Sequence, residues 1–221
     1  MDRSAVTADI ICEIGPVGVR RIGGATTGPA RTVDESLTSA ALDSDDPVLL
    51  VGVQAMTRDE VWQAVLEPML RADERTVLVH PSWWPEARID TIRQVAGRLC
   101  DDVGTRPRSW LLAAVAGRAP IVEIGPQVVL VTVDGEVVFG LQRRAATPGE
   151  VTEAIVRVVL RSTRGGTVWI DAPSGVAGAD ALAAQIAGRL KPTGHLMHRV
   201  ADRHMLSACL LYTSPSPRDR S

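Results

Sequence analysis

A tetrapeptide, Glu-Ile-Gly-Pro, occurs twice in the chain, half a chain apart. It begins at Glu13 and again at Glu123, and each time an apolar run precedes it and a second apolar run follows. A corner of glycine and proline between two such runs is typical of a β-hairpin. The same hairpin at the start of each half predicts a duplicated unit.

After each hairpin the pattern changes to strands that alternate with amphipathic helices, and in the second half Asp134-Gly135 predicts a type I′ turn into a third strand. We expect further strands at 48–51, 77–79, 110–113, 167–170 and 195–200. We expect helices over 57–69, 89–99, 151–159, 182–190 and 201–210. The apolar run 48–51 is of the kind that a sheet buries on both faces. The prediction is an α/β protein with two mixed sheets, flanked by helices, around a cleft.

The repeat divides the chain into predicted halves at 1–116 and 117–210. A hydrophobic content of 45% over 221 residues is ample for their cores. Residues 211–221 contain a Ser-Pro-Ser-Pro run and differ sharply from the body, so we interpret them as a non-native or disordered tail.

Composition excludes several classes of function. A net charge of −2 gives no general attraction to nucleic acid or to anionic membranes. The sequence shows neither a secretory signal nor an apolar run long enough to span a membrane. The three cysteines, Cys12, Cys100 and Cys209, are far apart and read as buried, reduced thiols. We therefore expect a cytoplasmic protein.

The paired hairpins resemble the two phosphate loops of the actin, sugar kinase and Hsp70 superfamily, each of which opens with an acidic residue and glycine. The stretch 77–84 and the pair Ala113-Ala114 are similar to segments of Hsp70. The resemblance implies an actin-like fold of two RNase H-like halves and ATP with Mg²⁺ as the cofactors of an active member. It implies phosphate-loop candidates at Glu13, Gly15, Gly18, Glu123 and Gly125, and adenosine-loop candidates at Asp171, Ser174 and Gly175.

A narrower resemblance is to the Hsp70-like N-terminal region of a type VII secretion-associated family of high-GC Gram-positive bacteria. The residues that carry it are Val79-His80-Pro81-Ser82-Trp83-Trp84 and the segment Asp59 to Trp62. It implies an accessory protein that contacts other secretion components.

Departures from the phosphate-loop pattern argue against catalysis. Pro16 and Pro126 follow the loop glycines, and each removes one backbone N–H that could donate to phosphate. Glutamate in place of aspartate moves each carboxylate, and Mg²⁺ tolerates little departure from octahedral geometry. No lysine precedes Lys191, which leaves Arg20 as a substitute positive charge. We predict a degenerate fold without catalytic or metal-binding residues; the alternative is an active ATPase that uses Glu13 and Glu123.

Four weaker signals have simpler structural interpretations. Ser174 lies on a strand–helix corner but lacks the flanking glycines of a hydrolase nucleophile. Zinc is disfavoured because His195 and His198, three apart on a strand, point to opposite faces, although His204 and Cys209 lie downstream. Trp83 and Trp84 are either internal packing or a partner-binding patch. The run Arg106-Pro107-Arg108 reads as a solvated loop.

Overall fold

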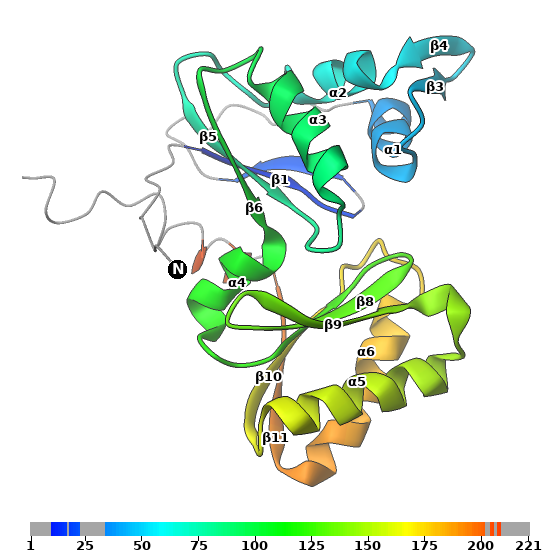
Figure 1. The fold of residues 1–221 in the computed structure, drawn as a ribbon, viewed down its shortest axis with the longest axis vertical. Helices are drawn as coiled ribbons and strands as arrows, with labels where there is room; N and C mark the ends of the chain where they lie inside the picture. Colours follow the sequence, from blue (N-terminus) through cyan, green and yellow to red (C-terminus); the bar gives the residue numbers. More distant parts are fainter. Residues whose placement is uncertain (1–9, 17, 23–33, 202–203, 206, 209–221) are drawn as a thin grey trace, which may run out of the picture. The chain divides into compact units, whose positions relative to one another are not determined.

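A computed structural model describes residues 10–16, 18–22, 34–201, 204–205 and 207–208. These residues form two compact units (Figure 1), which are described separately. Of the described residues, the first unit contains those up to His80 and Trp84–Arg106, and the second contains Pro81–Trp83 and those from Pro107 to Ala208. The predicted division at residues 116 and 117 stays a prediction.

The first unit is built on a four-stranded sheet of order β2-β1-β5-β6, with a separate two-stranded hairpin of β3 and β4. Strand β1 is antiparallel to β2 and parallel to β5, so the sheet is mixed. The strands are β1 Ile10–Ile14, β2 Val19–Ile22, β3 Val48–Val51, β4 Gln54–Thr57, β5 Arg75–His80 and β6 Asp102–Pro107. The helices are α1 Glu35–Asp43, α2 Arg58–Leu66 and α3 Glu86–Ala96.

The second unit is built on a five-stranded mixed sheet of order β11-β10-β7-β8-β9. Strand β7 is antiparallel to β8 and parallel to β10. The strands are β7 Ile121–Ile124, β8 Val128–Val133, β9 Glu136–Gln142, β10 Gly166–Asp171 and β11 His195–Arg199. The helices are α4 Arg108–Ala116, α5 Pro148–Ser162 and α6 Ala179–Leu190, with 3₁₀ turns at Arg143–Ala145 and Lys191–Thr193.

The predicted duplication is visible in the topology of each unit taken alone. In each, a hairpin (β1–β2 or β7–β8) is extended by a parallel strand and then by one more. The corners also match, because the Gly15 N–H donates to the Gly18 carbonyl at 2.7 Å and the Gly125 N–H donates to the Val128 carbonyl at 2.8 Å. The repeated tetrapeptide therefore marks the same hairpin corner in both units.

Local sequence signals account for several element boundaries. Thr57 and Glu60 form a reciprocal capping box at the start of α2, and Thr147 and Glu150 form another at the start of α5. Asp134 and Gly135 both have positive φ, 52° and 82°, as the predicted type I′ turn between β8 and β9 requires.

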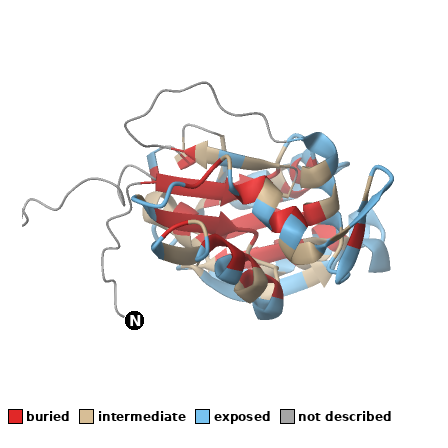
Figure 2. Ribbon diagram, turned by 90° about the horizontal axis from the view of Figure 1, so that it is seen from above, coloured by how far each residue is buried: buried red, intermediate tan, exposed pale blue. Residues whose placement is uncertain are grey.

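Each unit has its own hydrophobic core, formed where helices cover a sheet. Figure 2 shows central strands that are almost continuously buried, whereas the helices expose their outer faces. Trp62 of α2 is fully buried in the first core, and Ile155 of α5 is fully buried in the second. No described helix combines the length and apolar character needed to cross a membrane.

One predicted strand is a helix, and another predicted strand is present but is less buried than expected. Residues 110–113 lie in helix α4, whose Leu111 and Leu112 are buried, and the strand is instead β6, just before it. Residues 48–51 form a strand, but among the described residues it pairs with β4 alone, and Leu50 is 74% exposed. The apolar run is therefore buried on one face only.

Some expectations fall outside the described residues. These are the tail 211–221 and Cys209. Of the helix expected over 201–210, His204, Met205, Ser207 and Ala208 are helical. Cys12 and Cys100 are free and buried, as predicted.

Candidate functional site

The acidic residue of the first hairpin is neutralised within its own hairpin. Glu13 is 4% exposed, and Arg20 lies opposite it on β2 in the strand register. The Arg20 Nε donates to the Glu13 Oε2 at 2.5 Å. Because the arginine side chain is 46% exposed, water screens this pair in part. The carboxylate that the resemblance assigns to metal binding is thus held by a guanidinium.

The acidic residue of the second hairpin is almost completely buried. Glu123 is 1% exposed, and its Oε1 accepts a hydrogen bond from the Ser82 N–H at 3.2 Å. Its Oε2 has no hydrogen-bond partner among the described residues. Burial is the main cause that raises the pKa of Glu123 to about 7, and the nearby Asp171 carboxylate adds to the rise. At neutral pH a larger fraction of this carboxyl group is therefore protonated than of an ordinary glutamate.

Asp171 belongs to the same cluster. It pairs with Glu123 in the register of the parallel strands β10 and β7. Its two oxygens accept from the Arg108 Nε and Nη2, the latter at 3.2 Å, and both side chains are buried. The sequence interpretation of Arg108 as part of a solvated loop is wrong. Arg108 is the first residue of α4, and its side chain is a buried counter-ion.

Ser82 connects this cluster to the start of α4. Its hydroxyl oxygen accepts from the Ser109 N–H at 3.0 Å, while its own N–H donates to Glu123. An N-terminal helical N–H has no partner within its helix, so a side-chain acceptor stabilises this end. Ser82 belongs to the stretch that carries the family resemblance, but no pattern in the sequence predicts this role.

The Trp83 ring packs directly on the corner of the second hairpin. A Cβ added at Gly125 would lie 2.6 Å from this ring, which is closer than real side chains approach. Among the described residues, the equivalent glycine of the first hairpin is not covered in this way, because a Cβ at Gly15 would meet the Gly18 carbonyl alone, at 3.4 Å. The two corners share one backbone form but not the same surroundings.

Replacing Gly125 with alanine is expected to destabilise the protein by about 1–3 kcal/mol, because the ring of Trp83 must shift. The matched change Gly15→Ala is expected to cost less than about 0.5 kcal/mol. Urea denaturation measures both. In the background of Trp83→Ala the cost of Gly125→Ala falls, and equal costs in both backgrounds would contradict the packing seen here.

The adenosine-loop candidates differ in their surroundings. Asp171 is buried in the cluster with Arg108, whereas Ser174 and Gly175 are exposed on the turn that follows β10. Arg143 contacts this connection, although no sequence signal singled it out. Its guanidinium donates to the Gly125 carbonyl at 2.7 Å and to the Ala177 carbonyl at 2.8 Å. Arg143 therefore connects the hairpin corner to the loop before α6 through hydrogen bonds.

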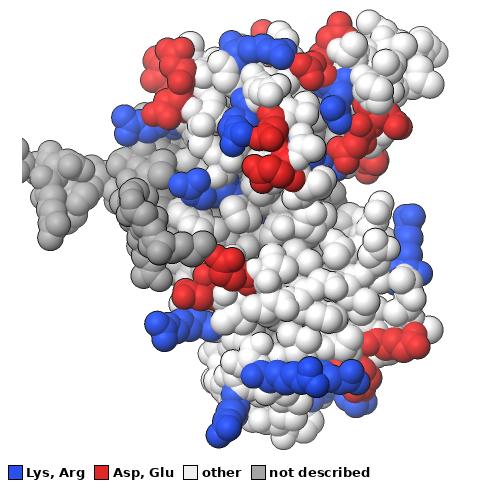
Figure 3. Space-filling view, viewed as in Figure 1, with Lys and Arg blue, Asp and Glu red and all other residues white. Residues whose placement is uncertain are grey.

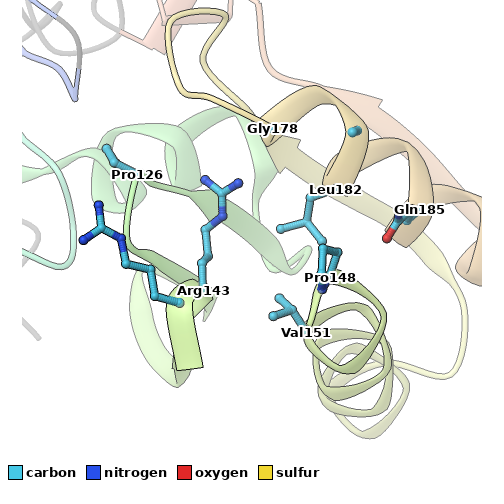
Figure 4. Close-up of a pocket in the computed structure, with 9 residues that line it drawn as sticks. Pro126, Arg143, Pro148, Val151, Gly178, Leu182 and Gln185 are labelled. Atoms are coloured by element: carbon cyan, nitrogen blue, oxygen red, sulfur yellow. The ribbon is translucent and has the colours of Figure 1, made fainter. Parts of the chain in front are cut away.

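A pocket of about 310 Å³ lies beside Arg143, and Figure 4 shows α5 and α6 contributing to its walls. Its lining is apolar apart from two arginines and a glutamine: Pro126, Arg143, Arg144, Pro148, Val151, Gly178, Ala181, Leu182 and Gln185. Helix α6 begins at its wall after Gly178 without a side-chain cap. Of the adenosine-loop candidates, none lines this pocket.

Trp84 packs inside the first unit. Its ring lies 6.2 Å from that of Trp62, edge to face, and is stacked on the His80 ring at 6.4 Å. The Arg88 guanidinium lies over it, 4.2 Å from the ring centre. Both tryptophans of the motif, Trp83 and Trp84, are half-buried with intramolecular contacts. The partner-binding patch that they suggested stays a prediction.

The described residues include no group of three or more histidine, cysteine or acidic side chains arranged to hold a metal ion. His195 is buried and its Nδ1 lies 2.8 Å from the Thr193 hydroxyl, whereas His198 on the same strand is exposed. His198 and His204 both contact the ring of Trp169 instead.

No protein-family model and no curated protein matches this chain. Among solved structures, the AlfA filament bound to AMPPNP superposes with a TM-score of 0.52 at 7% identity, covering 93% of this chain and 95% of that one. A Bacteroides thetaiotaomicron protein with an actin-like ATPase fold and unknown function gives a TM-score of 0.49 at 5% identity, with 96% and 98% covered. The ethanolamine utilization protein EutJ of Carboxydothermus hydrogenoformans gives 0.45 at 10% identity, with 93% and 88% covered. Together with the duplicated hairpin and the two mixed sheets, the superposition on AlfA shows that this protein has the actin-like α/β fold.

Proposed function

We propose that this protein is a non-catalytic, actin-like accessory protein of type VII secretion, which acts through contacts with other proteins. The observation that carries the non-catalytic part is the pairing of its acidic residues with arginines of the same unit. Glu13 is held by Arg20, and Asp171 is held by Arg108. A carboxylate engaged in this way has few lone pairs left for a metal ion or its water ligands.

Mg²⁺, which the fold family implies for ATP, does not fit the residues present. The carboxylate of each hairpin is poorly suited to coordinate it: Glu13 is ion-paired and buried, and the buried Glu123 favours its protonated form more than an ordinary glutamate does. The prolines after the corner glycines also disfavour MgATP, because Pro16 and Pro126 supply no N–H that could donate to phosphate. The second corner is also covered by Trp83.

The alternative, an ATP-binding actin-like ATPase, has one feature in its favour. The pocket beside Arg143 has an apolar lining and two cationic side chains, a combination suited to a small anionic ligand. Its position next to the loop before α6 makes it the place where a weakly bound nucleotide would be sought.

Two observations support contacts with protein partners. The stretch Val79 to Trp84 resembles the secretion-associated family, and the surface exposes apolar side chains. The hairpin of β3 and β4 exposes Val48, Leu50 and Val53, at 57%, 74% and 104%. In Figure 3 acidic and basic side chains are interspersed over the first unit, and the area over β8 and β9 is nearly free of charge. A surface of mixed charge with exposed apolar strands suits a protein partner better than nucleic acid.

Calorimetry with MgATP tests the non-catalytic part. The loss of one backbone donor in each corner removes about two to four decades of affinity, since a hydrogen bond to a charged group contributes about 1.5–3 kcal/mol. We therefore expect binding no tighter than about millimolar. The double change Pro16→Gly with Pro126→Gly is expected to strengthen it.

Micromolar affinity for MgATP that is lost on Glu13→Ala would contradict the proposal and restore the ATPase. Binding that is lost on Leu182→Gln but not on Glu13→Ala would place a nucleotide in the pocket without a phosphate loop. This outcome leaves the protein non-catalytic but able to bind nucleotide.

A further inference from the structure

We propose that the Arg108 guanidinium is a permanent internal cation of the second unit, which occupies the place beside two neighbouring carboxylates where a divalent metal ion would otherwise bind. The inference rests on the geometry of this unit alone. It holds whether or not the protein binds nucleotide.

The two carboxylates are neighbours because of strand register. Glu123 and Asp171 are directly paired on the parallel strands β7 and β10. Paired residues on adjacent strands point to the same face of a sheet, about 4.8 Å apart at the backbone. Glu123 is 1% exposed and Asp171 is 2% exposed, so water cannot separate their charges. Two carboxylates placed in this way need a cation.

Arg108 provides that cation with the geometry of a built site. Its planar fork binds both oxygens of Asp171, and its side chain is 9% exposed. Its charge also acts on Glu123, where it opposes the effect of burial. The Glu123 Oε2 has no partner among the described residues, so one oxygen of the pair remains open. The carboxylates carry up to two negative charges, and the guanidinium compensates only one.

A divalent ion and this guanidinium exclude each other. Mg²⁺ and Mn²⁺ require oxygen ligands at about 2.1–2.2 Å, and both Asp171 oxygens are committed to the fork. If the guanidinium is removed, what remains is two buried carboxylates, one of which accepts from the Ser82 N–H. One or two carboxylates plus water are the usual protein ligands of such ions.

The test uses Mn²⁺ alone, on the full chain, measured by calorimetry and by electron paramagnetic resonance. The unmodified protein is expected to show no saturable site, and its melting temperature should not change with Mn²⁺ or EDTA. Arg108→Met is expected to bind one Mn²⁺ at least about tenfold more tightly and to melt higher in its presence. The double variant Arg108→Met with Asp171→Asn should lose this binding.

Two further variants control for the position of the arginine and for its charge. Arg118→Met removes an exposed arginine from the connection between α4 and β7, and it should behave as the unmodified protein does. Arg108→Lys retains a positive charge, so it should fold without metal and should not bind Mn²⁺. Equal Mn²⁺ binding by Arg108→Lys and Arg108→Met would overturn the inference.

Arg108→Met is also examined for refolding with and without Mn²⁺, since it leaves two buried carboxylates without a counter-ion. Recovery of the folded protein only with Mn²⁺ supports the inference. Failure to fold in both conditions, or folding without any response to Mn²⁺, overturns it. So does a Mn²⁺ site in the unmodified protein that Asp171→Asn abolishes.

Discussion

The variant Glu123→Gln is expected to be more stable than the unmodified protein at pH 8, by about 2–3 kcal/mol, and equally stable at pH 4.5. The reason is the buried carboxyl group, whose pKa is raised to about 7 mainly by burial. The pKa of Glu123 is higher in the folded state than in the unfolded state. Stability is therefore fully present below the unfolded-state pKa, near 4.5, and it is lost as the pH rises through the folded-state pKa of about 7. Glutamine keeps the oxygen that accepts from Ser82 and carries no charge at any pH.

Urea denaturation from pH 4.5 to 8 measures this difference. The groups that act on Glu123 are the Asp171 carboxylate, the Ser82 hydroxyl and N–H and the Arg108 guanidinium. Glu150→Gln is the control of opposite sign, because hydrogen bonds from Thr147 lower the pKa of Glu150. Glu150→Gln should lower the free energy of unfolding at pH 8 and leave it unchanged in strong acid. A difference for Glu123→Gln that is the same at every pH would contradict a buried, titrating Glu123.

Arg88→Met is expected to cost about 3 kcal/mol of stability, which makes Arg88 one of the most important side chains of the first unit. The buried guanidinium donates to the last carbonyls of α1, those of Ala41 and Leu42, at 2.8 and 2.7 Å. It also lies over the Trp84 ring and pairs with Asp45 at 3.3 Å. Methionine fills the volume but leaves these carbonyls without a donor.

The control for this prediction lies on the same helix. Arg93 is half-exposed, and its pair with Asp90 is of the surface type. Arg93→Met should therefore change stability by less than about 0.5 kcal/mol. Equal unfolding midpoints for Arg88→Met and Arg93→Met in urea would show that Arg88 does not hold α1 in place.

Sequence patterns gave the correct result where the deciding interactions lie within a few residues of one another. The corner at Gly15, the turn at Asp134-Gly135 and the start of α2 at Thr57 each depend on the local backbone and on short-range hydrogen bonds. Patterns were insufficient where a run suits more than one structure. Residues 110–113 are apolar enough for a strand, but they lie in helix α4, where Leu111 and Leu112 are buried and Trp110 and Ala113 are half-buried.

By itself, the sequence determined the duplicated hairpin, the alternation of strands and helices and the two prolines that remove phosphate donors. Only the tertiary structure decided which charges neutralise the acidic residues. Arg108 and Asp171 are 63 residues apart, and Ser82 and Glu123 are 41 apart. Such pairs depend on the register of β7 and β10 and on where α4 begins, which are set when whole elements pack together. A single sequence carries no local signal of a partner that distant, because the energy of a buried ion pair depends on desolvation and geometry that exist only in the folded protein.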